Sequence, residues 1–161
     1  MRVDRKHTAY HEAGHAVIAL VLGYDVSKVT IRAAYSYLGI ARISNERCGS
    51  PGSTEVQARV DSEVDLVGHI CIGLAGPLAE KLVNHSAELI AYGARVDWER
   101  AQRRARRINR RQAEALIHAL MKETKTLVQQ HRKAIARVAA ALLDRETLRG
   151  DEIRQLVEVV S

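Results

Sequence analysis

The chain has 161 residues, enough for one domain with a substantial core, and its hydrophobic (47%) and charged (27%) fractions are typical of a soluble globular protein. Its two cysteines, Cys48 and Cys71, are far apart, which argues against a disulfide framework and against a cysteine-based zinc site. The net charge of +6 admits nucleic acid, anionic membrane or acidic proteins as partners without choosing among them.

The N-terminal residues carry no hydrophobic segment of the kind found in a signal peptide. The longest apolar stretch, residues 16–23, is far shorter than the roughly 20 residues that a membrane-spanning helix needs. The sequence therefore predicts a cytoplasmic protein with no membrane partner.

The first predicted element is a helix over residues 4–22, with Asp4 as its N-cap and Gly23 just beyond its end. The apolar residues in its second half recur at spacings of three and four, which predicts a half-buried helix. Gly14 lowers the stability of a helix, so its presence here predicts the close approach of another element.

This helix contains the sequence HEAGH, which places two histidines four residues apart. Because such residues lie on one face about one turn apart, His11 and His15 can bind the same metal ion. The motif is typical of two zinc-binding histidines with a glutamate as general base, which gives Glu12 that role. The competing interpretation is an ordinary helix that matches the short pattern by chance.

A hairpin is predicted next, from two runs rich in β-branched residues or otherwise extended, over residues 26–33 and 37–44. Glycine, proline and serine in residues 45–53 predict a loop.

A second helix is predicted over residues 62–83, beginning with a capping-box pattern at Ser62. Pro77 is expected to kink or divide this helix. Gly73 and Gly76 cost stability unless another element packs against their bare backbone.

The rest of the chain predicts a mixed connection over 84–95, a long helix from about Asp97, another helix over 122–144, and a short last helix capped by Asp151. The expected fold class is mainly α with a small β-hairpin or sheet. The long helix is predicted from a mostly apolar stripe that comprises Trp98, Ala101, Ala105, Ile108, Gln112, Ala115 and Ala119.

A zinc peptidase site also needs a third protein ligand, which leaves the fourth position for water. From the residues alone Asp97 ranks first, although an aspartate that opens a helix is commonly an N-cap. The other candidates are Glu80, His85, Glu88 and His118. The remaining histidines, His7, His69 and His131, are interpreted as solvent-facing or core residues.

Three blocks in the same order resemble the FtsH-type zinc peptidase domain: residues 9–19, residues 72–83 with 92–108, and residues 131–157. The resemblance implies a zincin-like HExxH helix in an FtsH-peptidase-like helical domain. It covers nearly the whole chain and implies a single domain over 1–161, with a metal-site part (1–110) and a C-terminal helical part (111–161).

The resemblance also assigns the site. It implies His11, His15 and Asp97 as ligands of Zn²⁺, with Glu12 as general base. It further implies that an extended substrate lies beside an edge strand, to which it can add through main-chain hydrogen bonds. In this sequence that strand corresponds to Leu38, Gly39, Ile40, Ala41 and Arg42.

The function expected from this resemblance is a zinc metallopeptidase that hydrolyses peptide bonds in flexible or unfolded polypeptides. The chain contains no GxxxxGK[ST] phosphate-binding motif, so ATP binding is not expected and the peptidase is expected to be stand-alone and ATP-independent. A homo-oligomer is compatible with the resemblance but not implied by the sequence. Two residues depart from the family pattern: Pro77 replaces an arginine, and Val96 replaces the asparagine before the ligand aspartate.

Two alternatives remain at the level of sequence: a catalytically silent metal-binding module, and a regulatory module associated with nucleic acid through the arginine run at 99–111. These arginines span a wide arc of the helix without interleaved aromatic residues, and no helix-turn-helix or RNA-binding signature accompanies them. We therefore interpret the run as a solvated helix surface, with nucleic acid not expected as a partner.

Overall fold

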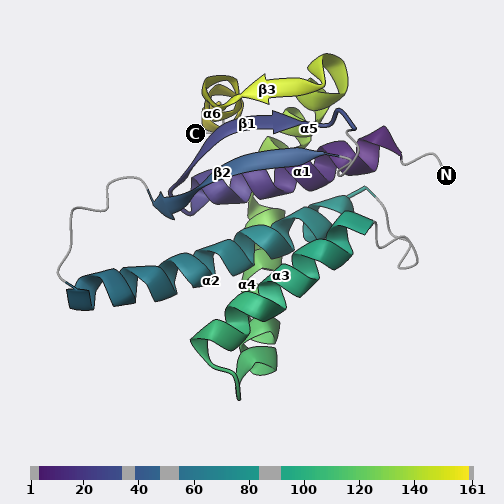
Figure 1. Ribbon diagram of the computed structural model, residues 1–161. Coiled ribbons are helices and arrows are strands. Elements are labelled where there is room, and N and C mark those ends of the chain that lie inside the picture. The colour runs from purple at the N-terminus through teal and green to yellow at the C-terminus, as the bar shows by residue number, and fades with distance from the viewer. Residues whose placement is uncertain (1–3, 34–38, 48–54, 84–91, 160–161) are drawn as a thin grey trace.

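The computed structural model describes residues 4–33, 39–47, 55–83 and 92–159. Within these residues six helices accompany one three-stranded antiparallel sheet (Figure 1), which confirms the mainly α fold class with a small sheet. The elements are α1 (Arg5–Val21), β1 (Tyr24–Thr30), β2 (Ile40–Arg47), α2 (Glu55–Glu80), α3 (Tyr92–Ile108), α4 (Ala113–Gln130), α5 (Arg132–Arg145), β3 (Thr147–Arg149) and α6 (Gly150–Glu158).

The boundaries of α1 agree with the prediction. The side chain of Asp4 accepts a hydrogen bond from the backbone N–H of Lys6 at 3.0 Å, which satisfies one of the free donors at the helix start. Gly23 has φ +88°, a left-handed conformation that a residue without a Cβ adopts readily, and the chain enters β1 directly after it.

The sheet has the order β2-β1-β3, so β1 is central and the predicted hairpin is confirmed. However, β2 continues to Arg47, which pairs with Tyr24, and the prediction of a loop from residue 45 is wrong there. β3 lies just before the last helix, in a segment for which no strand is predicted. It is a three-residue strand that pairs with the end of β1, for example Leu148 with Val29, and its own sequence is too short to indicate a strand.

Helix α2 begins earlier than predicted, so Ser62 lies inside the helix instead of capping it. It also continues through Pro77, so of the two predicted effects the division of the helix is wrong, and a kink stays a prediction. Pro77 lies in the last turn, where the missing N–H removes a single bond to the carbonyl of Gly73 and little helix remains to be disrupted.

The predicted long helix starting near Asp97 is divided into α3 and α4, and α3 already begins at Tyr92. The side chain of Asn109 accepts hydrogen bonds from the backbone N–H groups of Arg111 (3.1 Å) and Gln112 (3.2 Å), which replaces the helical pattern with a turn. On α4 a different face is buried, so Gln112, Ala115 and Ala119 of the predicted stripe are exposed.

Two further boundaries differ. The predicted helix over 122–144 is divided at His131 into the end of α4 and the whole of α5. Asp151 lies in the first turn of α6 and not at its N-cap, which is Arg149; the backbone N–H of Arg149 donates to the side chain of Glu152 at 2.8 Å.

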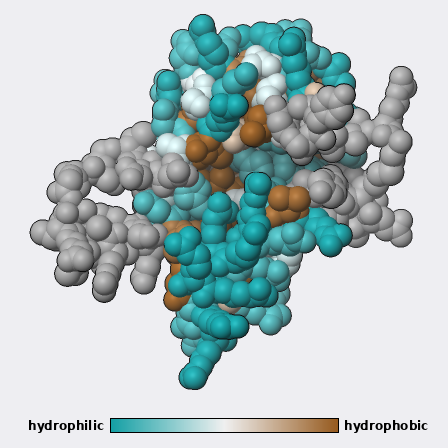
Figure 2. Space-filling view, in the orientation of Figure 1, coloured by the Kyte–Doolittle hydropathy of each residue, from teal (hydrophilic) through white to brown (hydrophobic). Residues whose placement is uncertain are grey.

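Helix α1 lies between the sheet and α2, and α5 also packs against it (Figure 1). The side of α3 that faces the viewer in Figure 2 is mainly hydrophilic, as expected for an outer helix. No helix in the described ranges combines the length and the apolar character that a bilayer span requires.

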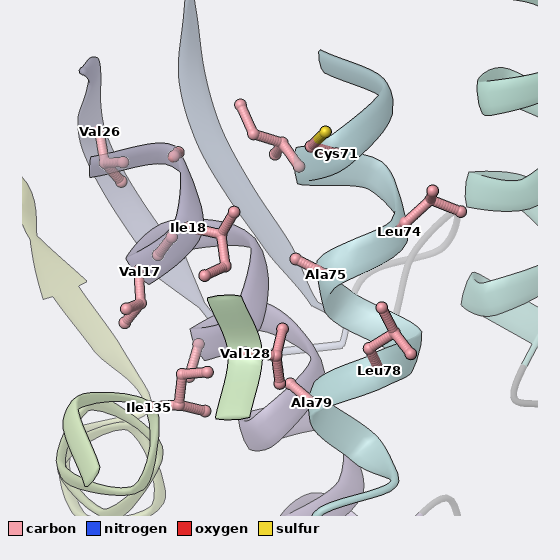
Figure 3. Close-up of a cluster of buried hydrophobic side chains, with 14 of the residues drawn as sticks. Val17, Ile18, Val26, Cys71, Leu74, Ala75, Leu78, Ala79, Val128 and Ile135 are labelled. Carbon is pink, nitrogen blue, oxygen red and sulfur yellow. The ribbon is translucent and has the colours of Figure 1, made fainter. Parts of the chain in front are cut away.

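The core is aliphatic and joins elements from both predicted parts of the chain. Figure 3 shows Ile18 on the side of α1 toward α2 and Val17 on the side away from it, with Val128 of α4 and Ile135 of α5 nearby, and all four are at most 1% exposed. The C-terminal helices therefore hold α1 in place. The predicted division into a metal-site part and a C-terminal part stays a prediction.

Candidate metal centre

Three side chains from two helices converge on one point. The Nε2 atoms of His11 and His15, both on α1, lie 3.0 Å and 3.2 Å from Oδ2 of Asp97 on α3. The same two Nε2 atoms are 2.9 Å apart, and one ligand atom from each of the three residues lies within 4.8 Å of the others. The structure thus brings together the three residues that the resemblance implied as ligands.

Hydrogen bonds on the far side of each imidazole orient the two rings. Nδ1 of His11 donates to Oε1 of Glu80 at 2.6 Å, and Nδ1 of His15 donates to the backbone carbonyl of Ile72 at 2.7 Å. These partners assign the protons to Nδ1, so in the neutral rings the lone pair of each Nε2 faces Asp97. Such partners are the usual outer support of metal-binding histidines.

Helix α2 presents this support on a single face. Ile72, Gly76 and Glu80 are spaced by four residues, so they follow one another along the side of α2 that faces α1. A Cβ added to Gly76 would contact Nε2 of His15 and would lie 2.9 Å from Nε2 of His11. Only glycine leaves room for the two ligand nitrogens, which explains its presence inside an apolar helix.

Gly14 confirms the predicted close approach. A Cβ there would lie 2.5 Å from Cβ of Ala79 and 2.6 Å from the carbonyl oxygen of Ala75, so α1 and α2 are in contact through small residues. This contact sets the distance over which Glu80 and Ile72 reach the histidines.

Glu12 is buried, with 6% of its surface exposed, on the same helix as the two histidines. Gly39 packs directly against it: a Cβ added to Gly39 would lie 2.8 Å from Oε1 of Glu12. Gly39 immediately precedes β2, so the start of this strand lies beside the carboxyl group that the motif assigns as general base.

The predicted substrate strand lies at an edge of the sheet. Ile40, Ala41 and Arg42 belong to β2, whose pairing in the described residues is with β1 alone. Leu38 lies outside the described residues. The role of this strand in binding substrate stays a prediction.

The ionisable side chains of the site shift one another's pKa values. Burial lowers the pKa of His11, but the carboxylates of Asp97 and Glu80 outweigh it and raise that pKa to about 10. Burial opposes ionisation of Asp97 too, yet the hydrogen bonds from His11 and His15 hold the pKa of Asp97 well below its usual range. Burial raises the pKa of Glu12, partly offset by the two imidazoles.

Two nitrogens and one carboxylate oxygen are a donor set that suits a divalent zinc ion with three protein ligands and one open position. The supporting hydrogen bonds and the space left by Gly76 fit the same interpretation. The residues present therefore match the requirements of a catalytic zinc site.

The other candidate ligands lie elsewhere. Glu80 stands behind His11 as its hydrogen-bond acceptor, and His118 is exposed on α4. His7 is 3.8 Å from Asp4 at the start of α1, His69 packs against Tyr24, and His131 lies between α4 and α5. His85 and Glu88 are outside the described residues.

Sequence reasoning missed the supporting roles of Ile72 and Glu80. The signal available was the spacing of four residues between Gly76 and Glu80, which repeats that of the two histidines. The carbonyl of Ile72 is a backbone group, so its residue type carried no signal.

Comparison with known proteins agrees with this geometry. Residues 1–111 match the family model Peptidase family M41. The chain is 31% identical to ATP-dependent zinc metalloprotease FtsH 1 of Symbiobacterium thermophilum, over 97% of this chain and 29% of that protein. It is 29% identical to ATP-dependent zinc metalloprotease FtsH of Thermus thermophilus, over 96% of this chain and 29% of that protein.

The ATP-dependent zinc metalloprotease FtsH of Magnetococcus marinus is 39% identical over 65% of this chain and 14% of its own length. The chain thus spans less than a third of the length of these curated relatives. The family match covers more than half of the chain and includes HEAGH and Asp97. The chain belongs to peptidase family M41.

Proposed function

We propose that this chain is a zinc-dependent endopeptidase that hydrolyses peptide bonds in flexible or unfolded polypeptides. The observation that carries the proposal is the convergence of His11, His15 and Asp97 beside the buried Glu12. Membership of an M41 peptidase family and relatives described as zinc metalloproteases support it.

His11, His15 and Asp97 would hold the zinc ion, with Glu80 and the Ile72 carbonyl keeping both imidazoles in the orientation that binding needs. Zinc, when bound, polarises the substrate carbonyl and lowers the pKa of a water molecule to about 7, which makes a nucleophile available at neutral pH.

Glu12 is the group of this chain that moves the proton. Its carboxylate accepts a proton from the attacking water and donates it to the amine that leaves when the peptide bond breaks. Burial raises the pKa of Glu12, which brings its carboxyl group closer to the operating pH of a proton carrier. Gly39, without a side chain, leaves space next to Oε1 of Glu12.

Substrate would lie extended along β2, with main-chain hydrogen bonds to the free edge supplied by Ile40, Ala41 and Arg42. This mode suits unfolded segments because it reads the backbone and not particular side chains. We further propose that hydrolysis itself needs no nucleotide, because the groups it uses, from His11 to Asp97, all belong to this chain.

The test measures zinc content and cleavage of unfolded casein without ATP, in the wild type, Asp97→Ala and Glu12→Gln. We expect the wild type to bind one zinc ion per chain and to cleave. Glu12→Gln should keep the zinc and lose cleavage by about 10²–10⁴-fold, because only the proton carrier is removed. Asp97→Ala should lose tightly bound zinc and cleavage together.

Full zinc binding by Asp97→Ala would overturn the ligand assignment. A wild type that holds zinc and cleaves no unfolded polypeptide, with or without ATP, would favour the catalytically silent metal-binding module. If the chain cleaved casein only with ATP and an added ATPase, the proposed independence of nucleotide would be wrong, while the peptidase function would stand.

A further inference from the structure

A pocket lies apart from the metal centre, at the corner where α3 turns into α4, and has a volume of about 340 Å³. Trp98 and Arg106 of α3 form one wall, together with Gln102 between them. These residues are four apart, so they share one face of α3. Asp97 precedes Trp98 by one residue and lies on a different face, against α1.

The turn after α3 supplies two further arginines, Arg110 and Arg111. Because the side chain of Asn109 binds the backbone N–H groups of Arg111 and Gln112, this turn has a defined shape. The floor is apolar: Ala113 and Ile117 of α4 are 8% and 3% exposed. The pocket is therefore a formed concavity with basic walls.

The pocket lining carries more positive than negative charge. Arg106, Arg110 and Arg111 face one carboxylate in the lining, Glu114, and none of the three forms an ion pair with a carboxylate in the described part of the chain. Guanidinium groups bind carboxylates in a planar, two-bond geometry. Figure 2 shows the surface around this lower corner as mainly hydrophilic.

Trp98 adds an apolar surface to the basic walls. It is 36% exposed, whereas most large hydrophobic side chains of the described residues are buried. An indole face beside guanidinium groups accepts an aliphatic or aromatic side chain and can also stack against an arginine. The complementary ligand therefore carries carboxylates next to an apolar group.

We propose that this pocket binds a short acidic segment of polypeptide, in which one or two carboxylates flank an apolar side chain, and that it serves as a docking site for substrates. The substrate role rests on the proposed peptidase function; the binding does not. Arg106 is nine residues after Asp97, or about 13 Å along α3. About four residues of extended chain cover that distance along the axis, and a substrate must extend further to pass around α3 from the pocket to Asp97.

Nucleic acid fits the pocket less well. Single strands are bound by successive aromatic side chains along a basic groove, and this lining has Trp98 as its one aromatic residue apart from the imidazole of His118. The carboxylate of Glu114 would repel a phosphate, and the apolar floor has no counterpart in a sugar-phosphate backbone.

Trp98 is the single tryptophan of the chain and lines the pocket, so its fluorescence reports on binding there. The zinc-loaded Glu12→Gln protein would be titrated with a tryptophan-free Asp/Glu/Leu peptide, with its Asn/Gln counterpart, and with an oligothymidylate of equal charge. Anisotropy of the labelled ligands gives a second, independent measurement. We expect saturable binding of the acidic peptide, weakened by salt, and weaker binding of the other two.

The variants compare two equal charge changes on the same surface. Adding Arg106→Gln, Arg110→Gln and Arg111→Gln together should weaken binding of the acidic peptide by roughly tenfold or more, because charge-assisted hydrogen bonds are lost. Arg100, Arg103 and Arg107 are exposed and do not line the pocket, so the matched triple Gln variant should change binding less than about threefold.

If both triple variants lost the same affinity for the acidic peptide, the peptide would bind through general attraction to a basic helix, and the proposed role of the pocket would be wrong. If the oligothymidylate bound more tightly than the acidic peptide, the ligand of the pocket would be nucleic acid and the proposal would be wrong. The absence of any response to the acidic peptide in both measurements would also refute it. In the active protein, the pocket triple should raise KM for an acid-tagged substrate, with kcat and the cleavage of a neutral substrate unchanged. If the wild type cleaves neither substrate, the peptidase function fails while the binding result stands.

Discussion

The two ends of α3 carry charges in opposite surroundings. Near its start, Asp97 is 9% exposed, and its Oδ2 lies 3.0 Å and 3.2 Å from Nε2 of His11 and His15 on another helix. At its other end, Arg106 and the following Arg110 and Arg111 are exposed and without an ion-pair partner among the described residues. The start of α3 therefore holds a buried carboxylate with close partners, and the region of its end holds exposed guanidinium groups.

This difference predicts what happens when each charged residue is substituted. A buried, hydrogen-bonded carboxylate is coupled to every neighbour, so its loss leaves polar groups unsatisfied in a low-dielectric interior. An exposed guanidinium is solvated and screened, so its loss matters only for a ligand that binds it. Substitutions around Asp97 should thus affect zinc and folding, and those at the arginine end should affect neither.

The largest effect is expected at Gly76, where a methyl group would contact the ligand nitrogens of His15 and His11. Gly76→Ala should prevent zinc binding and reduce cleavage to background. Its matched control is Gly73→Ala on the same helix, where the nearest atoms to an added Cβ are 3.8 Å away. The control should bind zinc normally and gain up to about 1 kcal/mol in stability, because alanine favours helix.

Zinc content by atomic emission and urea unfolding distinguish the two glycine variants. If Gly76→Ala bound zinc as tightly as the wild type, the close approach of α2 to the histidines would not define the metal centre.

A smaller effect is expected at Glu80, which supports His11 without converging on the ligand atoms. Glu80→Gln keeps an oxygen acceptor for Nδ1 of His11 but removes the negative charge, so zinc affinity should fall by about 10–100-fold. Competition with a chelator measures this change, and Glu80→Ala, which removes the acceptor as well, should weaken binding further. An unchanged affinity in both variants would assign Glu80 to packing alone.

The metal-free site should release a proton when it binds zinc. The pKa of His11 is raised to about 10, so this imidazole is protonated at pH 7 and must lose its proton to become a ligand. Zinc affinity should therefore rise with pH, by about tenfold per unit above pH 7 for one proton. Calorimetry in buffers of different ionisation enthalpy counts the protons, and a count of zero would contradict the charged state of His11.

The smallest effect is expected at the arginine end. Arg107 is exposed, lies outside the pocket lining and forms no ion pair with a described residue. Arg107→Gln should change the free energy of unfolding by less than about 0.5 kcal/mol and leave zinc content and casein cleavage unchanged. A clear loss of zinc in this variant would show that the two ends of α3 are coupled.

Much of the fold could be predicted where the determinants are local. The cap at Asp4, the glycine at the end of α1 and the β-branched residues of the hairpin act over a few residues, so the pattern indicates the element. The break after α3 also has a local determinant, the Asn109 side chain, but the apolar stripe that continues past it predicts a single helix; the face of α4 that is buried depends on packing against α2. β3 exists only because β1 lies beside it.

The candidate site divides in the same manner. The relative positions of His11, Glu12 and His15 follow from their spacing on one helix, which the sequence by itself determines. Asp97 ranks first among the third ligands although the sequence predicts it at the start of a helix; it lies inside α3, and the packing of both α1 and α3 against α2 brings it to the histidines. The support from Ile72 and Glu80, the space at Gly76 and the arginine pocket likewise join residues distant in the chain. Tertiary structure decided these because contact between distant residues depends on how helices pack, which spacing along one helix does not encode.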